Sequence, residues 1–257
     1  MTNYRLPDLP AHEVLTGLSN LHEHLHDYTG RTNSSSFHKA FKIVSSPNLK
    51  GDQQSIDQKR INIKQKKQSH LDVSNEEKEL ANILAVKQKY DALRTLFRTT
   101  YHRFVRNVVA PLLQCEPDEI YYQKQPVIRI VIPATEPVGH KHNDYEYHHQ
   151  PSEINFWVPL TNTHNTNSLY AETKPNGKDF KPFNCNVNLK EGQGEAMKFW
   201  GNQCTHYTVA NVEQATRISF DFRCIEKKKF NHDFVDSRGK PSAFKASHYY
   251  MDSAGKC

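Results

Sequence analysis

The chain has 257 residues, with 34 basic side chains, 28 acidic side chains and a formal net charge of +6. That length suits one sizeable domain with additions, or two small ones. No apolar run reaches the length of a membrane span, and residues 1–15 lack the basic and then apolar pattern of a secretory signal. The five cysteines are odd in number and include no Cys-x-x-Cys pair, which favours a reducing, cytoplasmic compartment.

The excess positive charge lies outside the segment that carries the motifs. Residues 120–225 contain ten Lys and Arg against ten Asp and Glu, whereas residues 1–119 contain 17 against 14 and residues 226–257 contain 7 against 4. The densest basic run, residues 59–67, is interleaved with Gln, Asn and Ile rather than with aromatic residues. Because a nucleic-acid polymer normally requires a dense phosphate-binding surface, we expect a small-molecule substrate and no nucleic-acid partner.

The N-terminal part of the chain predicts helices and irregular segments. Ser74 and Glu77 have the spacing of a capping box, and the apolar residues that follow recur at three and four positions. This pattern predicts one amphipathic helix, or two in succession, ending near Pro111 and packing on the outside of a sheet. Residues 31–69 are rich in Ser, Asn, Gln and Lys, which suggests a mobile connector or lid. We therefore assign residues 1–115 to an N-terminal extension that packs on the following core.

From Tyr121 onward the sequence changes to the period of a β-strand. Short stretches are alternating, or rich in β-branched and aromatic residues, with Pro, Gly and Asn between them and no helical pattern intervening. Such a series predicts a mainly β core over residues 116–257, with a C-terminal tail. A double-stranded β-helix (a cupin-like jelly roll) would bring opposing strands to one open mouth. The predicted strands are 127–132, 154–160, 168–172, 196–200, 204–210 and 216–225.

The tripeptide His142-Asn143-Asp144 is the most informative feature of the chain. On a strand, residues two apart point to the same face, so His142 and Asp144 can bind one side of a metal ion. His206, returning from a distant strand, would complete a set of two imidazoles and one carboxylate. That set occupies one face of an octahedral ion and leaves positions open for a chelating cosubstrate and O2, a geometry that favours Fe(II).

The last predicted strand has one polar and one apolar face, because side chains alternate along it. Arg217 lies eleven residues after His206, which leaves room for a turn and a returning strand. Its guanidinium can therefore meet the far carboxylate of a bound keto acid. The apolar face belongs to the core and consists of Ile218, Phe220 and Phe222. The polar face is left for a pocket and consists of Arg217, Ser219, Asp221 and Arg223.

In this combination of motifs, residues 121–225 resemble the Fe(II)/2-oxoglutarate-dependent dioxygenases of the double-stranded β-helix fold. The resemblance implies that His142, Asp144 and His206 bind iron. It also implies that Arg217, helped by the Ser219 hydroxyl, binds the distal carboxylate of 2-oxoglutarate. The expected cofactors are therefore Fe(II), 2-oxoglutarate as cosubstrate and O2. The other candidate positions are Asn155 and Thr161 for cosubstrate contacts, and Arg129 and Arg223 for a carboxylate of the substrate.

The amino-acid sequences of residues 153–161, 167–172 and 201–206 resemble those of a narrower branch, the tailoring oxygenases of natural products. That branch includes oxygenase-like proteins of streptomycin biosynthesis and the algal kainoid synthases. It implies C–H oxidation of a small, anionic, amino-acid-derived metabolite. Oxidative ring closure of a kainoid precursor is the sharpest form of this expectation, and plain hydroxylation is the default.

Two other functions remain open at this point. His140, His142 and Glu146, with His206, resemble the metal motif of cupins, which would allow a metal-binding or sugar-binding protein. The Pro-x-Gly usual before the last cupin histidine is absent, however, and Arg217 would have no task. The third possibility is a protein or RNA hydroxylase that grips a macromolecule with the basic N-terminal segment.

Overall fold

The computed structural model of the protein describes residues 2–5, 49–134, 136–137, 139–187, 194–246 and 248–252. The chain divides into two compact units, Glu23–Arg98 and a second unit formed by Met1–His22 together with Thr99–Cys257. The sequence-based boundary was placed at residue 115, whereas the unit that contains the sheets takes in the N-terminus and resumes at Thr99. No helix in the described part of the chain has both the length and the apolarity that a membrane span requires.

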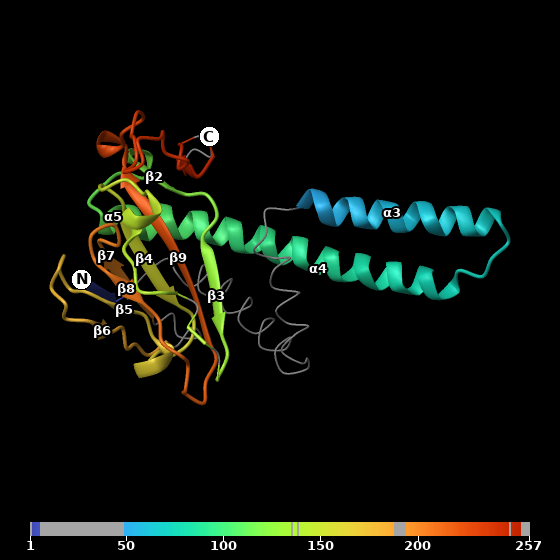
Figure 1. The fold of residues 1–257 in the computed structure, drawn as a ribbon, viewed down its shortest axis with the longest axis horizontal. Coiled ribbons are helices and arrows are strands. Elements are labelled where there is room, and N and C mark those ends of the chain that lie inside the picture. Colours follow the sequence, from blue (N-terminus) through green and yellow to red (C-terminus); the bar gives the residue numbers. More distant parts are fainter. Residues whose placement is uncertain are drawn as a thin grey trace. The chain divides into compact units, whose positions relative to one another are not determined.

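The first unit contains a helix that the sequence did not predict. Helix α3 (Leu49–Gln68) is followed by α4 (Ser74–Phe104), and α3 runs antiparallel to the first part of α4 (Figure 1). The interpretation of residues 31–69 as a mobile connector is wrong for α3, and residues 31–48 lie outside the described residues. Gln and Lys are good helix formers, and Ile56 and Ile63, seven residues apart, supply the buried side of this very polar helix.

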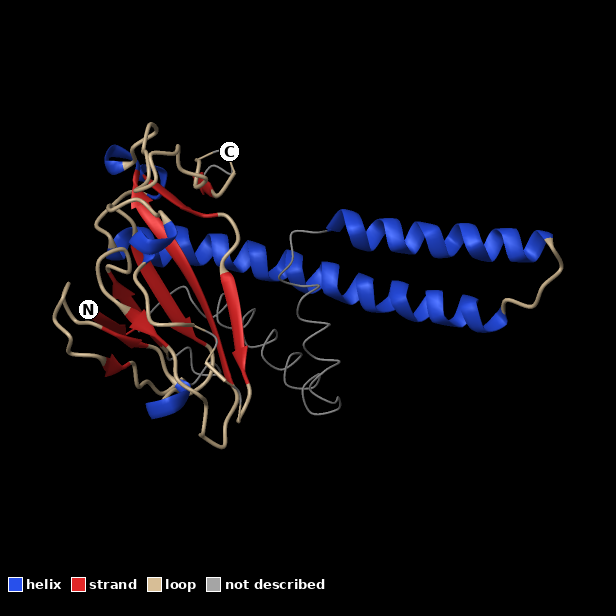
Figure 2. Cartoon of the chain, viewed as in Figure 1, coloured by secondary structure: helices blue, strands red, loops and turns tan. Residues whose placement is uncertain are grey.

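The larger sheet is antiparallel throughout and has β9 (Arg217–Glu226) at its centre (Figure 2). One side of β9 pairs with β4 (Ile154–Pro159). The other side pairs with β2 (Ile120–Gln123) towards one end and with β3 (Val127–Val131) towards the other. The sheet is completed by β7 (Glu195–Phe199), β1 (Thr2–Arg5) and β10 (Tyr250–Asp252), in the order β1-β7-β4-β9-β2-β10.

The structure also contains a smaller antiparallel sheet, which includes His206. Its strands are β6 (Lys181–Pro182), β5 (Tyr170–Ala171) and β8 (His206–Tyr207), in that order. Beyond β8, His142 forms an isolated antiparallel bridge with His206. Short helices lie in the connections, at Pro117–Glu119 (η2), Asp144–Tyr147 (η3), Asn165–Asn167 (η4) and Lys227–Lys229 (η6).

The end of α4 packs on the larger sheet, as the apolar stripe predicted. The helix continues through a π-helical turn (η1, Val105–Val109) into α5 (Ala110–Leu112), close to the predicted end at Pro111. The Tyr101 ring lies 5.2 Å from the Phe222 ring, and the Phe104 ring lies 6.1 Å from the Phe220 ring, both edge-on. This apolar layer fixes the orientation of β9, because its alternate residues must then point to the opposite face.

The prediction of a mainly β protein with N-terminal helices is confirmed by these antiparallel sheets. Each of the six predicted strands overlaps an observed strand. Two observed strands are much shorter than predicted, namely Tyr170–Ala171 within 168–172 and His206–Tyr207 within 204–210. The prediction did not include β1, β2, β6 or β10. Of these, β1 and β10 are short edge strands whose partners lie far away in the chain.

Candidate active site

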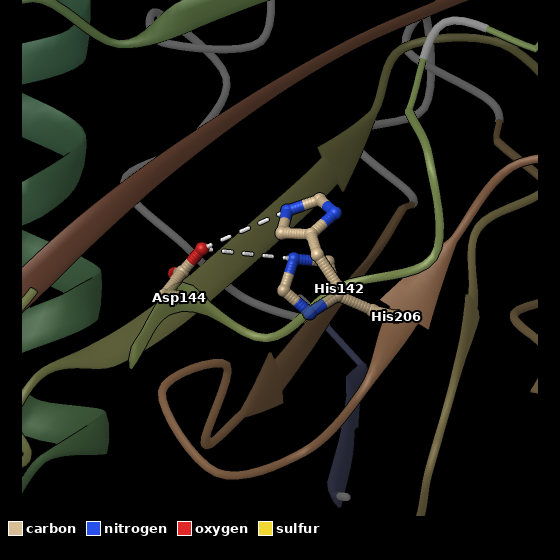
Figure 3. Close-up of side chains that lie close together, drawn as sticks. All are labelled: His142, Asp144 and His206. Carbon is tan, nitrogen blue, oxygen red and sulfur yellow. Dashed lines mark ion pairs between the residues drawn. The ribbon is translucent and has the colours of Figure 1, made fainter. Parts of the chain in front are cut away.

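The structure brings His142, Asp144 and His206 together, and we call these three residues the triad. Each offers one ligand atom, and the three atoms lie within 4.8 Å of one another. The Nε2 atoms of His142 and His206 lie 3.9 Å and 3.8 Å from Oδ1 of Asp144 (Figure 3). Within the described residues, this is the group of His, Cys, Asp and Glu side chains with the spacing of a metal site.

The triad is assembled by local backbone structure that differs in part from the prediction. His142 pairs with His206 through two backbone hydrogen bonds of 3.1 Å and 2.8 Å, so its strand-like placement is as expected. Asp144, however, begins the 3-10 helix η3 rather than continuing a strand. Asn143 and Glu146 cap each other's backbone N–H groups at 3.2 Å, which turns the chain immediately after His142. The carboxylate nevertheless faces both imidazoles.

Both histidines are oriented by their second ring nitrogen. The Nδ1 atoms of His142 and His206 lie 2.5 Å from the carbonyl of His140 and 3.1 Å from that of Cys204. A carbonyl only accepts, so each Nδ1 carries the proton and each Nε2 presents a lone pair towards Asp144. Burial lowers the pKa of His206 against the opposing effect of Asp144, which favours the neutral, metal-binding form.

Asp144 is buried and held by three hydrogen bonds from two side chains. The Arg223 guanidinium donates to both of its oxygens, from Nε at 2.8 Å and from Nη2 at 2.9 Å. Asn155 donates from Nδ2 at 2.7 Å. Burial alone would raise the pKa of Asp144, but the Arg223 charge and hydrogen bonds hold that pKa well below its usual range. Asp144 is therefore an anion at neutral pH.

A cavity of about 260 Å³ lies beside the triad and is lined from both sheets. The larger sheet contributes Arg129, Asn155, Trp157, Phe199, Arg217, Asp221 and Arg223. The smaller sheet and the connecting segments contribute Gly139, His140, His142, Tyr147, Leu169, His206, Tyr207 and Thr208. As the parity of β9 predicted, its charged residues reach the cavity while Phe220 and Phe222 are buried against α4.

Arg217 is a buried cation in the wall of this cavity, only 1% exposed. Its Nη1 donates to the carbonyls of Asn167 and Ser168 at 3.2 Å and 3.3 Å, and its guanidinium lies 5.7 Å from the Trp157 ring. Its Nε and Nη2 have no hydrogen-bond partner within the described residues. Burial, and then the like charge of Arg129, lowers the pKa of Arg217 to about 10. A buried guanidinium in this state has the free donors that a carboxylate ligand requires.

Of the three residues predicted to bind the cosubstrate together with Arg217, Ser219 and Thr161 lie outside the cavity lining. Ser219 is fully buried two positions from Arg217, and its Oγ has no partner among the described residues. Thr161 instead accepts a hydrogen bond from the backbone N–H of Ile218 at 3.0 Å, which ties the segment after β4 to β9. Asn155 does line the cavity, but its amide N–H is engaged by Asp144.

The predicted substrate arginines both have carboxylate partners inside the protein. Arg129 donates to Asp221 from Nε at 2.5 Å, and Arg223 is paired with Asp144. Both guanidinium groups line the cavity as predicted, but each already has a carboxylate partner before any substrate is bound. Alternation along β9 placed Asp221 and Arg223 on the pocket face, but it could not show that each closes an ion pair with a distant residue.

Two residues that the sequence analysis did not single out support Arg223. Glu153 is fully buried, and its Oε2 lies 3.8 Å from Nε of Arg223 and 2.8 Å from Nδ1 of His149. Tyr249, near the C-terminus, accepts a hydrogen bond from Nη1 of Arg223 at 3.1 Å. Glu153 immediately precedes β4, and a charged residue at the start of a buried strand was the available signal.

The residues of the cupin alternative are not brought together. His140 lines the cavity but is exposed, and its carbonyl serves to orient His142. The Glu146 carboxylate is exposed and accepts the backbone N–H of Asn143. Among the described residues the metal group contains Asp144 in place of Glu146.

No protein-family model matches the chain. Over 160 residues it is 28% identical to the streptomycin biosynthesis protein StrG of Streptomyces griseus, an alignment that covers 62% of this chain and 70% of that protein. The solved structures that the chain matches include a nickel complex of the non-heme monooxygenase ThoJ, with a TM-score of 0.36, 13% identity and 63% of each chain covered. The α-ketoglutarate-dependent epimerase SnoN of nogalamycin biosynthesis has a TM-score of 0.36 and 15% identity over 51% of this chain and 58% of its own. AviO1 of Streptomyces viridochromogenes has a TM-score of 0.37 and 12% identity over 56% and 66%. The chain thus spans less than two thirds of the length of each of these three structures.

Proposed function

We propose that the protein is an Fe(II)/2-oxoglutarate-dependent dioxygenase built on a double-stranded β-helix. The observation that carries the proposal is the pairing, in one cavity, of a two-histidine, one-carboxylate triad with a buried arginine that lacks an anionic partner among the described residues. The jelly-roll assignment is supported by two antiparallel sheets that both contribute residues to the cavity lining.

The donor set of the triad fits Fe(II). Two imidazole nitrogens with free lone pairs and one ionised carboxylate form the combination found in non-heme iron oxygenases that keep coordination positions open. The backbone carbonyls that bind the two Nδ1–H groups fix each ring in the required tautomer. His142, Asp144 and His206 would hold the metal.

Arg217 fits the distal carboxylate of 2-oxoglutarate, because its Nε and Nη2 are buried donors without partners in the described structure. The formal charges of the site agree with this assignment when imidazoles are counted as neutral. Arg223 lies between two carboxylates, Asp144 and Glu153, so that cluster carries one negative charge. Arg129 and Asp221 cancel, which leaves Arg217 as one positive charge. A divalent cation beside the cluster of Asp144, Glu153 and Arg223, with a dicarboxylate bound to Arg217, leaves the filled site neutral.

The protein's own groups would bind and orient the cosubstrate and shield the cavity. Trp157 and Phe199 form apolar walls of the cavity, and Arg217 would fix one end of the cosubstrate. When bound, Fe(II) with 2-oxoglutarate as co-reductant supplies the activation of O2 that oxidises a substrate C–H bond and releases succinate and CO2.

The proposed substrate is a small metabolite rather than a nucleic acid. The similarity to a protein named for streptomycin biosynthesis supports a natural-product substrate. Ring closure of an anionic, amino-acid-derived kainoid precursor is the most specific form of the proposed reaction, and plain hydroxylation is its general form. Because Arg129 and Arg223 already have carboxylate partners, a substrate carboxylate would have to share Arg129 with Asp221 at the cavity wall.

The test is turnover coupled to succinate formation. The purified protein is incubated with Fe(II), ascorbate and 2-oxoglutarate, together with N-substituted glutamates, free amino acids, basic peptides or RNA. We expect succinate and a modified product with a small molecule; a gain of one oxygen identifies hydroxylation, and a loss of two hydrogens identifies ring closure or desaturation. Coupled turnover only with peptides or RNA contradicts the small-molecule substrate. Absence of both succinate formation and any 2-oxoglutarate-dependent thermal shift contradicts the dioxygenase itself.

A further inference from the structure

Asp144 has unequal oxygens, and this difference determines how it can bind a metal. A carboxylate oxygen offers about two lone-pair sites. Oδ2 accepts from Arg223 Nε at 2.8 Å and from Asn155 Nδ2 at 2.7 Å, so both of its sites are used. Within the described residues, Oδ1 accepts a hydrogen bond from Arg223 Nη2 alone, at 2.9 Å. It is also the oxygen closest to both histidine Nε2 atoms. One site on Oδ1 is therefore left for a metal ion.

Arg223 is itself fixed by groups from several parts of the chain. Its Nη1 donates to Tyr249 Oη at 3.1 Å and to Gln123 Oε1 at 3.4 Å, and its Nε lies 3.8 Å from Glu153 Oε2. Glu153 in turn accepts the backbone N–H of Gln150 at 2.8 Å. Each nitrogen of the guanidinium thus has at least one partner, and the fork cannot rotate without breaking several contacts.

Glu153 also compensates for the positive charge that Arg223 places next to Asp144. A guanidinium paired with Asp144 alone would cancel the negative charge of the carboxylate that must attract a dication. With His149 counted as neutral, the second, fully buried carboxylate of Glu153 gives the cluster a net negative charge. Buried ion pairs are weak contributors to stability compared with apolar packing, so a cluster of this kind beside a metal ligand indicates a functional constraint.

We propose that Arg223, held by Glu153, Tyr249 and Gln123, is a positioning residue that makes Asp144 a one-oxygen metal ligand through Oδ1. The inference rests on the proposed function, since it concerns the metal of that site. By occupying Oδ2, the network prevents two-oxygen coordination, which would consume a position needed by the cosubstrate or O2.

The direction in which one substitution changes the metal affinity distinguishes a positioning role from a purely electrostatic effect. Arg223→Met removes a positive charge next to a dication, so electrostatics alone predicts tighter metal binding. Loss of positioning predicts weaker binding instead, typically by roughly tenfold to a hundredfold. Arg129→Met is the matched control, because it also removes a cavity cation from an ion pair, with Asp221, but one that does not touch the triad.

The experiment is calorimetric titration of the full-length, metal-free protein with Co(II), supplemented by the visible absorption of bound Co(II), which reports coordination number. We expect Arg223→Met to bind Co(II) roughly tenfold to a hundredfold more weakly than wild type, with an altered spectrum. Arg223→Lys keeps the charge but loses the fork, so it should also bind more weakly. Arg129→Met should bind as tightly as wild type or more tightly.

Equal or tighter binding by folded Arg223→Met, with an unchanged spectrum, overturns the positioning role. Should Arg223→Met fail to fold, the double variant Glu153→Gln/Arg223→Met also removes one of the two carboxylates that lie against Arg223. Wild-type affinity in that variant or in Arg223→Lys overturns the inference equally. Failure of the wild-type protein to bind Co(II) or Fe(II) contradicts the proposed function rather than the role of Arg223.

Discussion

Arg217→Leu should abolish most of the affinity for 2-oxoglutarate while leaving the metal site and the ligand-free fold intact. The guanidinium is 1% exposed and has two donors without partners among the described residues, so it is arranged for an anion that comes from outside. Its removal takes away a buried charge with no carboxylate partner in that part of the structure. We therefore expect the ligand-free variant to be at least as stable as wild type.

The size of the effect follows from a charge-assisted, two-donor contact in a buried wall. Loss of such a contact costs on the order of 2 to 5 kcal/mol, which is a factor of roughly 30 to several thousand in Kd. At a 2-oxoglutarate concentration about one hundred times the wild-type Kd, the ligand stabilises wild type by about 2.7 kcal/mol. A thirtyfold weaker Kd reduces this to about 0.9 kcal/mol. For a domain of this size the thermal shift falls from about 5–11 °C to about 2–4 °C or less.

The assay is thermal denaturation with and without 2-oxoglutarate in the presence of Mn(II), together with a metal titration of each variant. Arg217→Lys keeps the charge but not the fork and should be intermediate. Arg238→Met serves as the control, because Arg238 pairs with Asp236 and is not among the residues that line the cavity. An unchanged 2-oxoglutarate shift in Arg217→Leu would refute the assignment. A large loss of ligand-free stability would show that Arg217 is structural.

Three further predictions follow from other parts of the fold. Alanine at any member of the triad should abolish turnover and greatly weaken Fe(II) binding, measured by metal analysis after gel filtration, whereas Glu146→Ala should retain iron because its carboxylate is used in a backbone cap. Burial raises the pKa of Glu172, but hydrogen bonds led by the backbone N–H of Thr205 lower it overall. Its stabilising effect is thus present above the unfolded pKa near 4.5 and is lost as pH falls through the lower folded value. Glu172→Gln should therefore melt below wild type at neutral pH, with a difference that disappears in acid; a constant difference would contradict this origin. Tyr101→Phe should lower the free energy of unfolding by about 1–3 kcal/mol in a denaturant titration, because the buried carbonyl of Gln123 loses the Tyr101 hydroxyl.

The sequence determined the features that depend on local pattern. The period of two after Tyr121 predicted the antiparallel strands, and the apolar stripe before Pro111 predicted the helix that covers Phe220 and Phe222. The same alternation placed Arg217 on the cavity face. These predictions succeed because burial of one face is enforced residue by residue along a helix or strand.

The tertiary structure decided which charged groups meet. Arg129 and Arg223 were predicted to be available to a substrate, yet their partners lie 92 and 79 residues away in the chain. Asp144 begins a 3-10 turn instead of continuing a strand, and the reciprocal cap of Asn143 and Glu146 closes that turn. Ion pairs between distant strands depend on register and on the rotamers of long side chains, neither of which leaves a periodic signal in the sequence. The one cation that folding leaves without an anion among the cavity residues, Arg217, could be recognised only after all the others had been paired.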